Sequence, residues 1–316
     1  MKNLLASVLF SLLVIMVQAQ PLQQSGWLKV SGTRLVNEQD QPVVLHGMSF
    51  GWHNLWPRFY NKGAVHELVT KWHCNIIRAS MGIELNDSGY LKSPKQSVKL
   101  MTNVIDACIK EGVYVIIDWH DHNIHTKEAK EFFGRMSAKY KDHPNIIYEV
   151  FNEPDYESWA EVKKYAEEVV AVIRANDAKN IILVGCPKWD QEILEPANDP
   201  IKGFGNLMYT MHFYAGTHKQ WLRDRTDEAI AKGLPVFVSE CAAMEASGDG
   251  PIDSTEWKLF KNWMDRKQLS WIAWSVSDKK ETCSVLLPSA KSRGKWKEED
   301  IKEWGRLARK ELQAYK

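Results

Sequence analysis

Two glutamates, Glu153 and Glu240, each stand at the end of a short apolar run of the β-strand type. Two carboxyl groups that face each other across a small gap can hydrolyse a glycosidic bond, because one protonates the leaving oxygen while the other attacks the sugar or directs a water. A separation of about 5–5.5 Å gives a covalent intermediate and retention of configuration, and a wider gap gives inversion. The two groups must also differ in environment, so that one is protonated and the other ionised.

Polar and aromatic residues end several other apolar runs, and their types suit a sugar-binding site. They are Arg78, His120, Asn152, His212, Tyr214 and Trp274. We expect Arg78 and Tyr214 to hold Glu240 ionised, by opposite charge and by hydrogen bonding. Any one of these residues alone is more often structural, as an ion-pair partner, a core histidine or a core tryptophan. Their joint placement at strand ends predicts one shared site.

The remaining members of this group have expected roles of their own. His120 and His212 either adjust the protonation of Glu153 or bind hydroxyls. Asn152 is placed to donate to a 2-hydroxyl, a hydrogen bond that strengthens in the transition state of glycosidic cleavage. Trp274 offers a flat apolar face on which a sugar ring can stack.

The elements that must position these residues alternate between strand and helix along the chain. Eight short apolar runs predict strands at residues 43–50, 75–81, 114–120, 146–153, 180–186, 207–214, 235–240 and 270–276. Segments of helical period lie at 97–110, 159–175, 254–266 and 298–314. Eight β-to-α units predict an α/β fold, a (β/α)8 TIM barrel, whose chemistry sits at the C-terminal ends of the strands. Residues 28–43 predict a β-hairpin that covers the barrel bottom, and a doubly wound open sheet is the alternative fold.

The first nineteen residues have the form of a secretory signal peptide. Lys2 gives a basic start, residues 4–17 are almost wholly apolar, and Val17-Gln18-Ala19 supplies small residues for cleavage. The apolar run is too short for a membrane helix, and a buried N-terminal helix is the alternative. We expect cleavage after Ala19 or Gln20, a secreted protein, and a single catalytic domain over residues 20–316.

Composition argues against several classes of partner. Lys and Arg number 41 against 40 Asp and Glu, so the formal net charge is +1, and no basic cluster indicates nucleic-acid binding. No later apolar run approaches the roughly 18 residues of a membrane span. The five cysteines are scattered and odd in number, so at least one thiol stays free or pairs between chains. We expect a monomer that acts on a neutral polysaccharide.

One polar loop offers an alternative chemistry. His120, Asp121, His122 and His125 lie within six residues, and side chains of these types can bind a catalytic metal. We favour one site histidine followed by polar loop residues, and we predict no metal and no other cofactor. Activity that survives a chelator would exclude a metal-dependent hydrolase.

The motif Asn152-Glu153-Pro154, at the end of the fourth predicted strand, resembles the signature of clan A glycoside hydrolases. Within that clan the chain resembles glycoside hydrolase family 5, in particular its endoglucanase-rich subfamily 2. The likeness covers about residues 27–310, in the right order and at the right strand ends. Besides Phe151-Asn152-Glu153-Pro154, it is carried by His46-Gly47-Met48-Ser49, Ile77-Arg78-Ala79-Ser80-Met81-Gly82, Ile117-Asp118-Trp119-His120, Met211-His212-Phe213-Tyr214, Val238-Ser239-Glu240 and Trp274-Ser275-Val276-Ser277-Asp278-Lys279-Lys280-Glu281.

The resemblance implies a role for each matching residue. Glu153 is the general acid/base and Glu240 the nucleophile of a retaining double displacement. Lys279 and Glu281 match the loop after the eighth strand that binds the neighbouring glycone sugar. Trp189 matches an aromatic platform beside the cleavage point. The other strand-end residues match further active-centre positions of the family.

Two stretches stand apart from this match. After the first predicted strand, Trp52, His53 and Trp56 are expected to help line the glycone side of the cleft. After the nucleophile, the family usually has an aromatic residue, often followed by Gly-Thr, whereas this chain has Cys241-Ala242-Ala243. The departure concerns the packing behind Glu240 and leaves both carboxylates in place.

The expected substrate follows from the barrel mouth, whose long loops form an open cleft that suits an internal stretch of a polymer. We predict endo-hydrolysis of β-1,4-glucan, meaning cellulose, its soluble derivatives or mixed-linkage glucan, and the match of Lys279 and Glu281 favours glucan. A β-1,4-mannanase or xylanase on the same scaffold is the alternative within the class. From another class, a catalytically silent carbohydrate-binding barrel would be expected to lack one carboxylate, and both are present.

Overall fold

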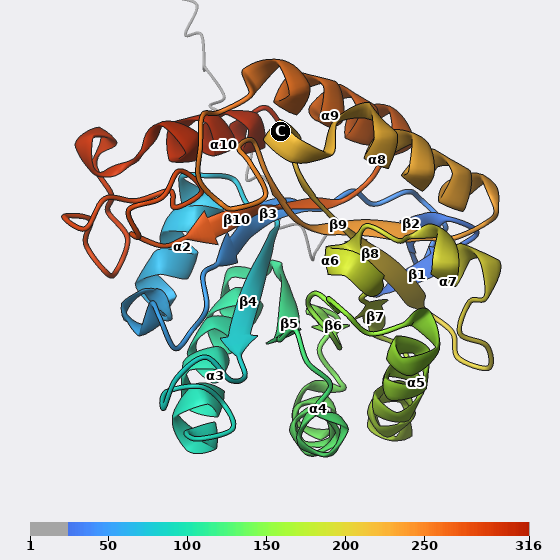
Figure 1. Ribbon diagram of the computed structural model, residues 1–316. Helices are drawn as coiled ribbons and strands as arrows, with labels where there is room; N and C mark the ends of the chain where they lie inside the picture. Colours follow the sequence, from blue (N-terminus) through green and yellow to red (C-terminus); the bar gives the residue numbers. More distant parts are fainter. Residues whose placement is uncertain (1–24, 316) are drawn as a thin grey trace, which may run out of the picture.

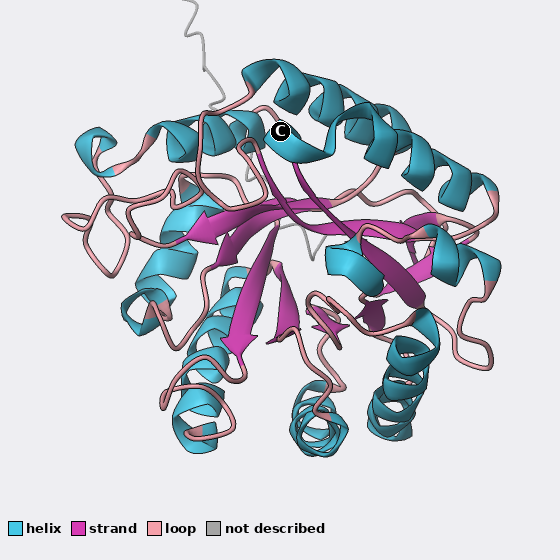
Figure 2. Ribbon diagram, in the orientation of Figure 1, coloured by secondary structure: helices cyan, strands magenta, loops and turns pink. Residues whose placement is uncertain are grey.

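The computed structural model describes residues 25–315, and in it eight parallel strands close into a barrel inside a ring of helices (Figure 1, Figure 2). The strands are β3 (His46–Phe50), β4 (Ile76–Gly82), β5 (Tyr114–His120), β6 (Ile146–Glu149), β7 (Ile181–Val184), β8 (Leu207–Tyr214), β9 (Val236–Ala242) and β10 (Trp271–Val276). They are neighbours in chain order, and β10 pairs with β3 to close the ring. The predicted (β/α)8 barrel is therefore confirmed over the open sheet.

Every barrel strand leads into at least one helix. The helices are α2 (Lys62–Thr70), α3 (Pro94–Glu111), α4 (Thr126–Tyr140), α5 (Trp159–Asn176), α6 (Pro187–Asp190), α7 (Leu194–Asn198), α8 (Ala215–Ala231), α9 (Ser254–Lys267) and α10 (Glu303–Gln313), with 3-10 turns η1 (Pro57–Phe59) and η2 (Glu298–Asp300). The last helix begins later than predicted, because η2 forms a separate turn and Ile301 bridges to Leu286 before the chain coils again. Helix starts follow local chemistry, as at Ser158 and Glu161, which form a reciprocal capping box on α5.

Strand residues alternate between the barrel interior and the surrounding helices. On β4, Ile77 packs into the large apolar core under the helices, whereas Ile76 belongs to a smaller cluster inside the barrel. Because successive strand residues face opposite sides, Arg78 has the parity of Ile76 and projects into the barrel above it. The same alternation turns Asp118 and His120 of β5 inward. Buried polar side chains therefore stack above an apolar floor.

The predicted hairpin is present and closes the barrel floor. It consists of β1 (Leu28–Ser31) and β2 (Arg34–Asn37), which pair antiparallel. Leu28 and Leu35 are buried in the same cluster as the inward residues of the barrel floor. The backbone N–H of Val30 donates to Asn206 Oδ1 at 3.0 Å, which fixes the hairpin below β8. The end opposite to the hairpin is left for the site.

Several strand boundaries differ from the prediction: β3 begins at His46 instead of residue 43, β7 ends at Val184 instead of residue 186, and two further differences lie beside the glutamates. Strand β6 ends at Glu149, not at Glu153, because the chain beyond it no longer forms a continuous ladder of backbone hydrogen bonds. Single bonds remain, in which the Asn152 N–H donates to the Trp119 carbonyl and the Glu153 N–H to the Asp121 carbonyl. Strand β9 continues past Glu240 to Ala242. Its register against β8 and β10 shifts at a bulge next to Glu240.

Other sequence predictions concern termini, membranes and cysteines. The predicted signal peptide lies outside the described residues. Among the residues that are described, no helix has both the length and the apolar character that a membrane crossing requires. All five cysteines are buried free thiols, so none forms a disulfide within the described chain.

Candidate active site

Arg78 lies at the centre of a buried polar cluster at the C-terminal end of the barrel strands. Its Nε donates to Glu149 Oε2 at 2.7 Å, its Nη1 to Glu240 Oε2 at 2.9 Å and its Nη2 to Asn152 Oδ1 at 2.6 Å. Asp118 Oδ2 lies 3.1 Å from Nη2. Burial opposes the charge of this guanidinium, but the surrounding carboxylates outweigh burial and raise its pKa. Arg78 is therefore a permanent cation on β4 that orients residues from β5, β6 and β9.

Glu240 accepts a hydrogen bond on each carboxylate oxygen. Arg78 Nη1 donates to Oε2, and the Tyr214 hydroxyl donates to Oε1 at 2.7 Å. Two donors fix the carboxylate plane, and a guanidinium has no lone pair with which to accept a proton. Ser239 and Glu240 are adjacent in sequence, yet both form hydrogen bonds with inward-facing residues. The bulge on β9 allows this, because it interrupts the strict alternation of the strand.

Glu153 is held from the opposite side by His212 of β8. The distance from His212 Nδ1 to Glu153 Oε1 is 2.9 Å. The other ring nitrogen, Nε2, lies 2.8 Å from Ser239 Oγ and 3.2 Å from Asp190 Oδ2. Burial opposes protonation of His212, but the charge of Asp190 and the contacts with Glu149 and Glu153 raise its pKa well above the usual value. The ring is therefore an imidazolium that donates to Glu153.

The two glutamates and His212 converge on one point of the mouth. One carboxylate oxygen of Glu153, one of Glu240 and one ring nitrogen of His212 all lie within 4.8 Å of one another. Glu240 is 4% exposed. Burial, and then the charge of Glu153, raise the pKa of Glu240. Burial acts in the same direction on Glu153, but the hydrogen bond and charge of His212 outweigh it and lower the pKa of that carboxyl.

This geometry agrees with comparisons of the chain with known proteins. Residues 36–280 match the family model described as "Cellulase (glycosyl hydrolase family 5)". The chain belongs to glycosyl hydrolase family 5. It is 40% identical over 279 residues to endoglucanase A of Evansella cellulosilytica, an alignment that covers 86% of this chain and 56% of that protein. It is 36% identical to an endoglucanase of Clostridium saccharobutylicum, covering 91% of this chain and 65% of the relative.

Solved structures extend the similarity to the whole barrel. A protein from Cytophaga hutchinsonii superimposes with a TM-score of 0.92 at 39% identity, covering 94% of this chain and 97% of that one. The catalytic domain of Thermobifida fusca endoglucanase Cel5A gives a TM-score of 0.88 at 32% identity, covering 93% and 100%. The chain thus spans about the full length of these domains, but only 56% and 65% of the two curated relatives.

Beside the acid pair of this family 5 protein, the structure brings an imidazole and two indoles together. The rings of His120 and Trp274 stack with centroids 5.1 Å apart, and Trp52 meets His120 edge-on at 4.4 Å. His120 Nδ1 lies 2.6 Å from Asp118 Oδ2, which assigns the proton to Nδ1 and leaves Nε2 as an acceptor. Burial, with the charge of Arg78, lowers the pKa of His120. The ring is therefore neutral.

Lys279 and Glu281 form an ion pair in the loop after β10 of this family 5 barrel. The Lys279 side chain is 58% exposed, whereas that of Glu281 is 12% exposed. Cys283 Sγ donates to Glu281 Oε1 at 3.3 Å, and Lys302 Nζ donates to the Glu281 backbone carbonyl. Glu281 is therefore fixed by contacts from Cys283 and Lys302, whereas the Lys279 side chain is largely exposed.

Trp189 stands at the rim on a strained segment. Lys188, Trp189 and Asp190 have φ values of 54°, 55° and 60°, a left-handed run that is costly for residues other than glycine. The Trp189 side chain is partly exposed and meets Tyr156 edge-on at 6.0 Å. The same backbone turn places the fully buried Asp190 against His212. One strained turn therefore positions both Trp189 at the rim and Asp190 beside His212.

His53 lies below the surface, not in the open cleft. It is 0% exposed. Its Nδ1 accepts from the Gly82 backbone N–H at 2.9 Å, and its Nε2 therefore donates to Ser97 Oγ at 2.8 Å. Burial lowers its pKa to about 4, so the ring is neutral. With both nitrogens occupied, the ring supports the loop after β3, and its neighbour Trp52 is half-buried.

Several members of the cluster were not identified from the sequence. Asp118 and Glu149 contact Arg78, and Asp190 and Ser239 contact His212. A signal existed for two of them, because Asp118 and Glu149 are charged residues at inward positions of otherwise apolar strands. Asp190 lies on an irregular turn and gave no such signal.

Proposed function

We propose that this chain is a retaining endo-β-1,4-glucanase. The observation that supports this most is the acid pair at the barrel mouth, with oxygens of Glu153 and Glu240 within 4.8 Å. That spacing suits direct attack by one carboxylate, because it is close to the separation of about 5–5.5 Å in retaining enzymes and well below the roughly 6.5–9.5 Å of inverting ones. The curated relatives are named endoglucanases, and the matching family model is named for cellulase.

The first step of the proposed mechanism needs Glu153 protonated and Glu240 ionised. Without substrate, the site favours the opposite protonation states. His212 favours ionised Glu153, and the charge of Glu153 raises the pKa of Glu240 and so favours its protonated form. Transfer of the Nδ1 proton from His212 to Glu153 Oε1, across 2.9 Å, reverses this. It neutralises Glu153, which removes the charge that disfavours ionised Glu240. Asp190 and Ser239 still hold the neutral imidazole through Nε2.

Glycosylation and deglycosylation then follow from the same two groups. Glu240 attacks the anomeric carbon while Glu153 gives its proton to the leaving oxygen, so that a glycosyl ester forms and the aglycone departs as an alcohol. Glu153, now ionised, takes a proton from water, and the resulting hydroxide equivalent displaces Glu240 from the ester. Arg78 and Tyr214 stabilise the Glu240 carboxylate each time it is released. Two inversions give net retention.

Neighbouring side chains provide the proposed substrate contacts. The Asn152 amide nitrogen has no protein partner, because its oxygen is the atom that accepts from Arg78, so Nδ2 is free to donate to a 2-hydroxyl. His120 and Trp274 offer an acceptor and a stacking face. Trp189 is assigned to an aromatic platform, and Lys279 with Glu281 to the next glycone sugar. The partner is thus a neutral β-glucan.

The proposal includes the whole chain. We propose one catalytic domain over residues 20–316, export after removal of residues 1–19, and action as a monomer outside the cell. The basic and apolar segments of the N-terminal sequence support export.

Initial rates on barley β-glucan, carboxymethylcellulose, mannan and xylan test this proposal directly. We expect the fastest hydrolysis on a β-1,4-glucan, with viscosity falling well before reducing ends accumulate. Proton NMR of the first products should show the β-anomer, which then mutarotates. Faster cleavage of mannan or xylan, or an initial α-anomer, would contradict the substrate or the mechanism, respectively.

The charge coupling between the glutamates predicts a change in pH dependence. Glu240 must be ionised to attack, so activity falls as the pH drops through its raised pKa. Glu153→Gln removes the charge that contributes to this shift. We expect the acid limb of kcat/KM to move down by about 1–2 pH units. The measurement uses dinitrophenyl β-cellobioside, whose leaving group needs no acid. Glu228→Gln, an exposed change on α8, should leave the limb in place, and an unmoved limb in Glu153→Gln would refute the coupling.

A further inference from the structure

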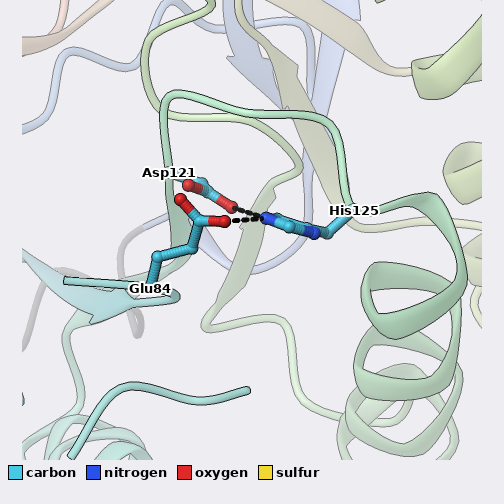
Figure 3. A group of neighbouring side chains, drawn as sticks. All are labelled: Glu84, Asp121 and His125. Carbon is cyan, nitrogen blue, oxygen red and sulfur yellow. Dashed lines mark hydrogen bonds and ion pairs between the residues drawn. The ribbon is translucent and has the colours of Figure 1, made fainter. Parts of the chain in front are cut away.

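A second cluster of metal-ligand types lies beside the acid pair, in two neighbouring loops (Figure 3). Glu84 follows β4, and Asp121 and His125 lie between β5 and α4. One carboxylate oxygen from each acid and one ring nitrogen of His125 lie within 4.8 Å of one another. His125 Nε2 is 2.7 Å from Glu84 Oε1 and 3.6 Å from Asp121 Oδ2, and both carboxylates point at the ring.

Asp121 carries an oxygen that no protein group satisfies. Its side chain is buried, with a residue exposure of 3%. Oδ1 accepts from the backbone N–H groups of His122 and Asn123, which closes a tight turn. Oδ2 is buried and, among residues 25–315, has no hydrogen-bond partner, although it faces His125.

We propose that Glu84, Asp121 and His125 bind one divalent transition metal ion of the Zn²⁺ or Mn²⁺ type. Two carboxylates and one imidazole are a mixed O/N donor set, which such ions accept and which Ca²⁺, with its all-oxygen preference, does not favour. Bonds of about 2.0–2.2 Å in tetrahedral geometry separate ligand atoms by about 3.4 Å. The His125–Asp121 distance of 3.6 Å is close to this value. Glu84, whose side chain is 45% exposed, has room to withdraw from its shorter contact.

Binding exchanges a proton for the metal. In the present arrangement His125 Nε2 donates its hydrogen to Glu84, and metal ligation requires that nitrogen as a lone pair. If the ring also carries a hydrogen on Nδ1, the Nε2 proton is released to solvent; if it carries only the Nε2 hydrogen, that hydrogen moves to Nδ1, so that the ligating ring is neutral in both cases. Asn123, whose amide donates to Glu84 Oε2 at 3.0 Å, stands beside the fourth position, and water completes the coordination.

The proposed ion is structural and differs from a catalytic metal. His120 is bonded to Asp118 and takes no part. Instead, the ion ties the loop after β4 to the loop after β5, which together line a hollow of about 550 Å³ next to Trp52. The second loop also supports the acid/base residue, because the Asp121 carbonyl accepts from Glu153 N–H at 3.2 Å and His122 Nδ1 lies 3.1 Å from the Glu153 carbonyl. The ion would stiffen this support.

Isothermal titration of the tag-free full chain, stripped with EDTA and dialysed, with ZnCl₂ and separately with MnCl₂ tests the proposal. We expect one site per chain for at least one of the two ions, and a melting temperature raised by roughly 5–10 °C at about 100 times the Kd. His125→Gln and Glu84→Gln should each weaken binding at least tenfold and, at the same metal concentration, reduce the thermal shift to about half or less. His66→Gln is the matched control, because His66 pairs with Glu111 at 3.0 Å without a third ligand, and it should bind as the wild type does.

The alternative location for an ion is the trio of Glu153, His212 and Glu240, whose ligand atoms also lie within 4.8 Å of one another. Binding there would survive in His125→Gln, disappear in Glu240→Gln and compete with cellobiose. That pattern, or no saturable binding of either ion, would overturn the proposal. Loss in His125→Gln with retention in Glu240→Gln supports it. These outcomes are independent of the substrate assignment, because binding and melting are measured without turnover.

Discussion

Replacing Glu240 with alanine will lower turnover of carboxymethylcellulose by roughly a thousandfold or more, and azide will restore activity on dinitrophenyl β-cellobioside. The loss follows because no other group can form the glycosyl ester. The rescue follows from the two donors that the substitution leaves behind. Arg78 Nη1 and the Tyr214 hydroxyl, which hold the two carboxylate oxygens at 2.9 and 2.7 Å, then face a space that a small anion can fill.

The stereochemistry of the rescued product distinguishes the two glutamates. In Glu240→Ala, azide attacks from the side of the missing nucleophile in a single displacement, so the product is the α-glycosyl azide. In Glu153→Ala, the ester on Glu240 still forms from an activated substrate, and azide then displaces it to give the β-azide. Proton NMR gives the anomeric configuration of each azide product and so shows which glutamate is the nucleophile and which is the acid/base.

Two outcomes would contradict the assignment of roles. One is near-normal turnover of carboxymethylcellulose by Glu153→Gln or Glu240→Gln, provided that both melt like the wild type. The other is an exchange of the two azide products, which would assign the nucleophile to Glu153. The isosteric glutamine variants serve as the fold control, since they keep the shape of the side chains while removing their acid–base function.

The sequence predicted the barrel because buried parallel strands leave an unusual pattern. A run such as Val115-Ile116-Ile117 lacks alternation since both faces are buried, and the polar residue that follows marks the mouth. The same logic found Arg78, His120, His212 and Tyr214, whose strands are regular. It also predicted that Arg78 and Tyr214 flank Glu240, as the hydrogen bonds now describe.

The contacts and positions that the sequence did not predict lie where the backbone departs from regular strands and helices. A bulge lets Ser239 and Glu240 both bond inward, whereas strict alternation would turn one of them away. Asp190 reaches His212 through a left-handed turn that no residue type in Pro187-Lys188-Trp189 announces. His53 was expected on the glycone side and is buried, because the chain folds under Trp52 after β3. Periodicity carries no information about such positions.

The departure at Cys241 also finds a structural account. Cys241 is fully buried in the outer apolar core, and its Sγ donates to the Ile272 carbonyl at 3.3 Å. The side chain therefore packs behind Glu240, between β9 and its neighbours, and away from the cleft. Ala242 and Ala243 are buried in the same core. The departure changes packing behind Glu240 without changing what the cleft presents.

Arg78→Ala will be the most destabilising single substitution in the site, lowering the free energy of unfolding by about 3–5 kcal/mol. The reason is that it leaves Asp118, Glu149 and Glu240 buried without their shared cation. At about 2–4 °C per kcal/mol, this corresponds to a fall in Tm of roughly 6–20 °C. Arg78→Lys keeps one charge but cannot reach all partners, so it should lose less stability while still losing most of the activity.

Arg223→Ala provides the matched control for that substitution. Arg223 is also buried, yet it has one carboxylate partner, Glu256 at 2.9 Å, and lies outside the mouth, so its loss should cost less and spare activity.

The pH dependence of the Arg78→Ala deficit tests whether uncompensated charge causes it. With Arg78 present, Glu149 has a lowered pKa and stabilises the fold at neutral pH. Without it, the buried carboxyls have raised pKa values, so the deficit of Arg78→Ala should shrink as the pH falls and they become neutral. A deficit that is equal at pH 4.5 and 7.5 would mean that lost packing, not uncompensated charge, is responsible.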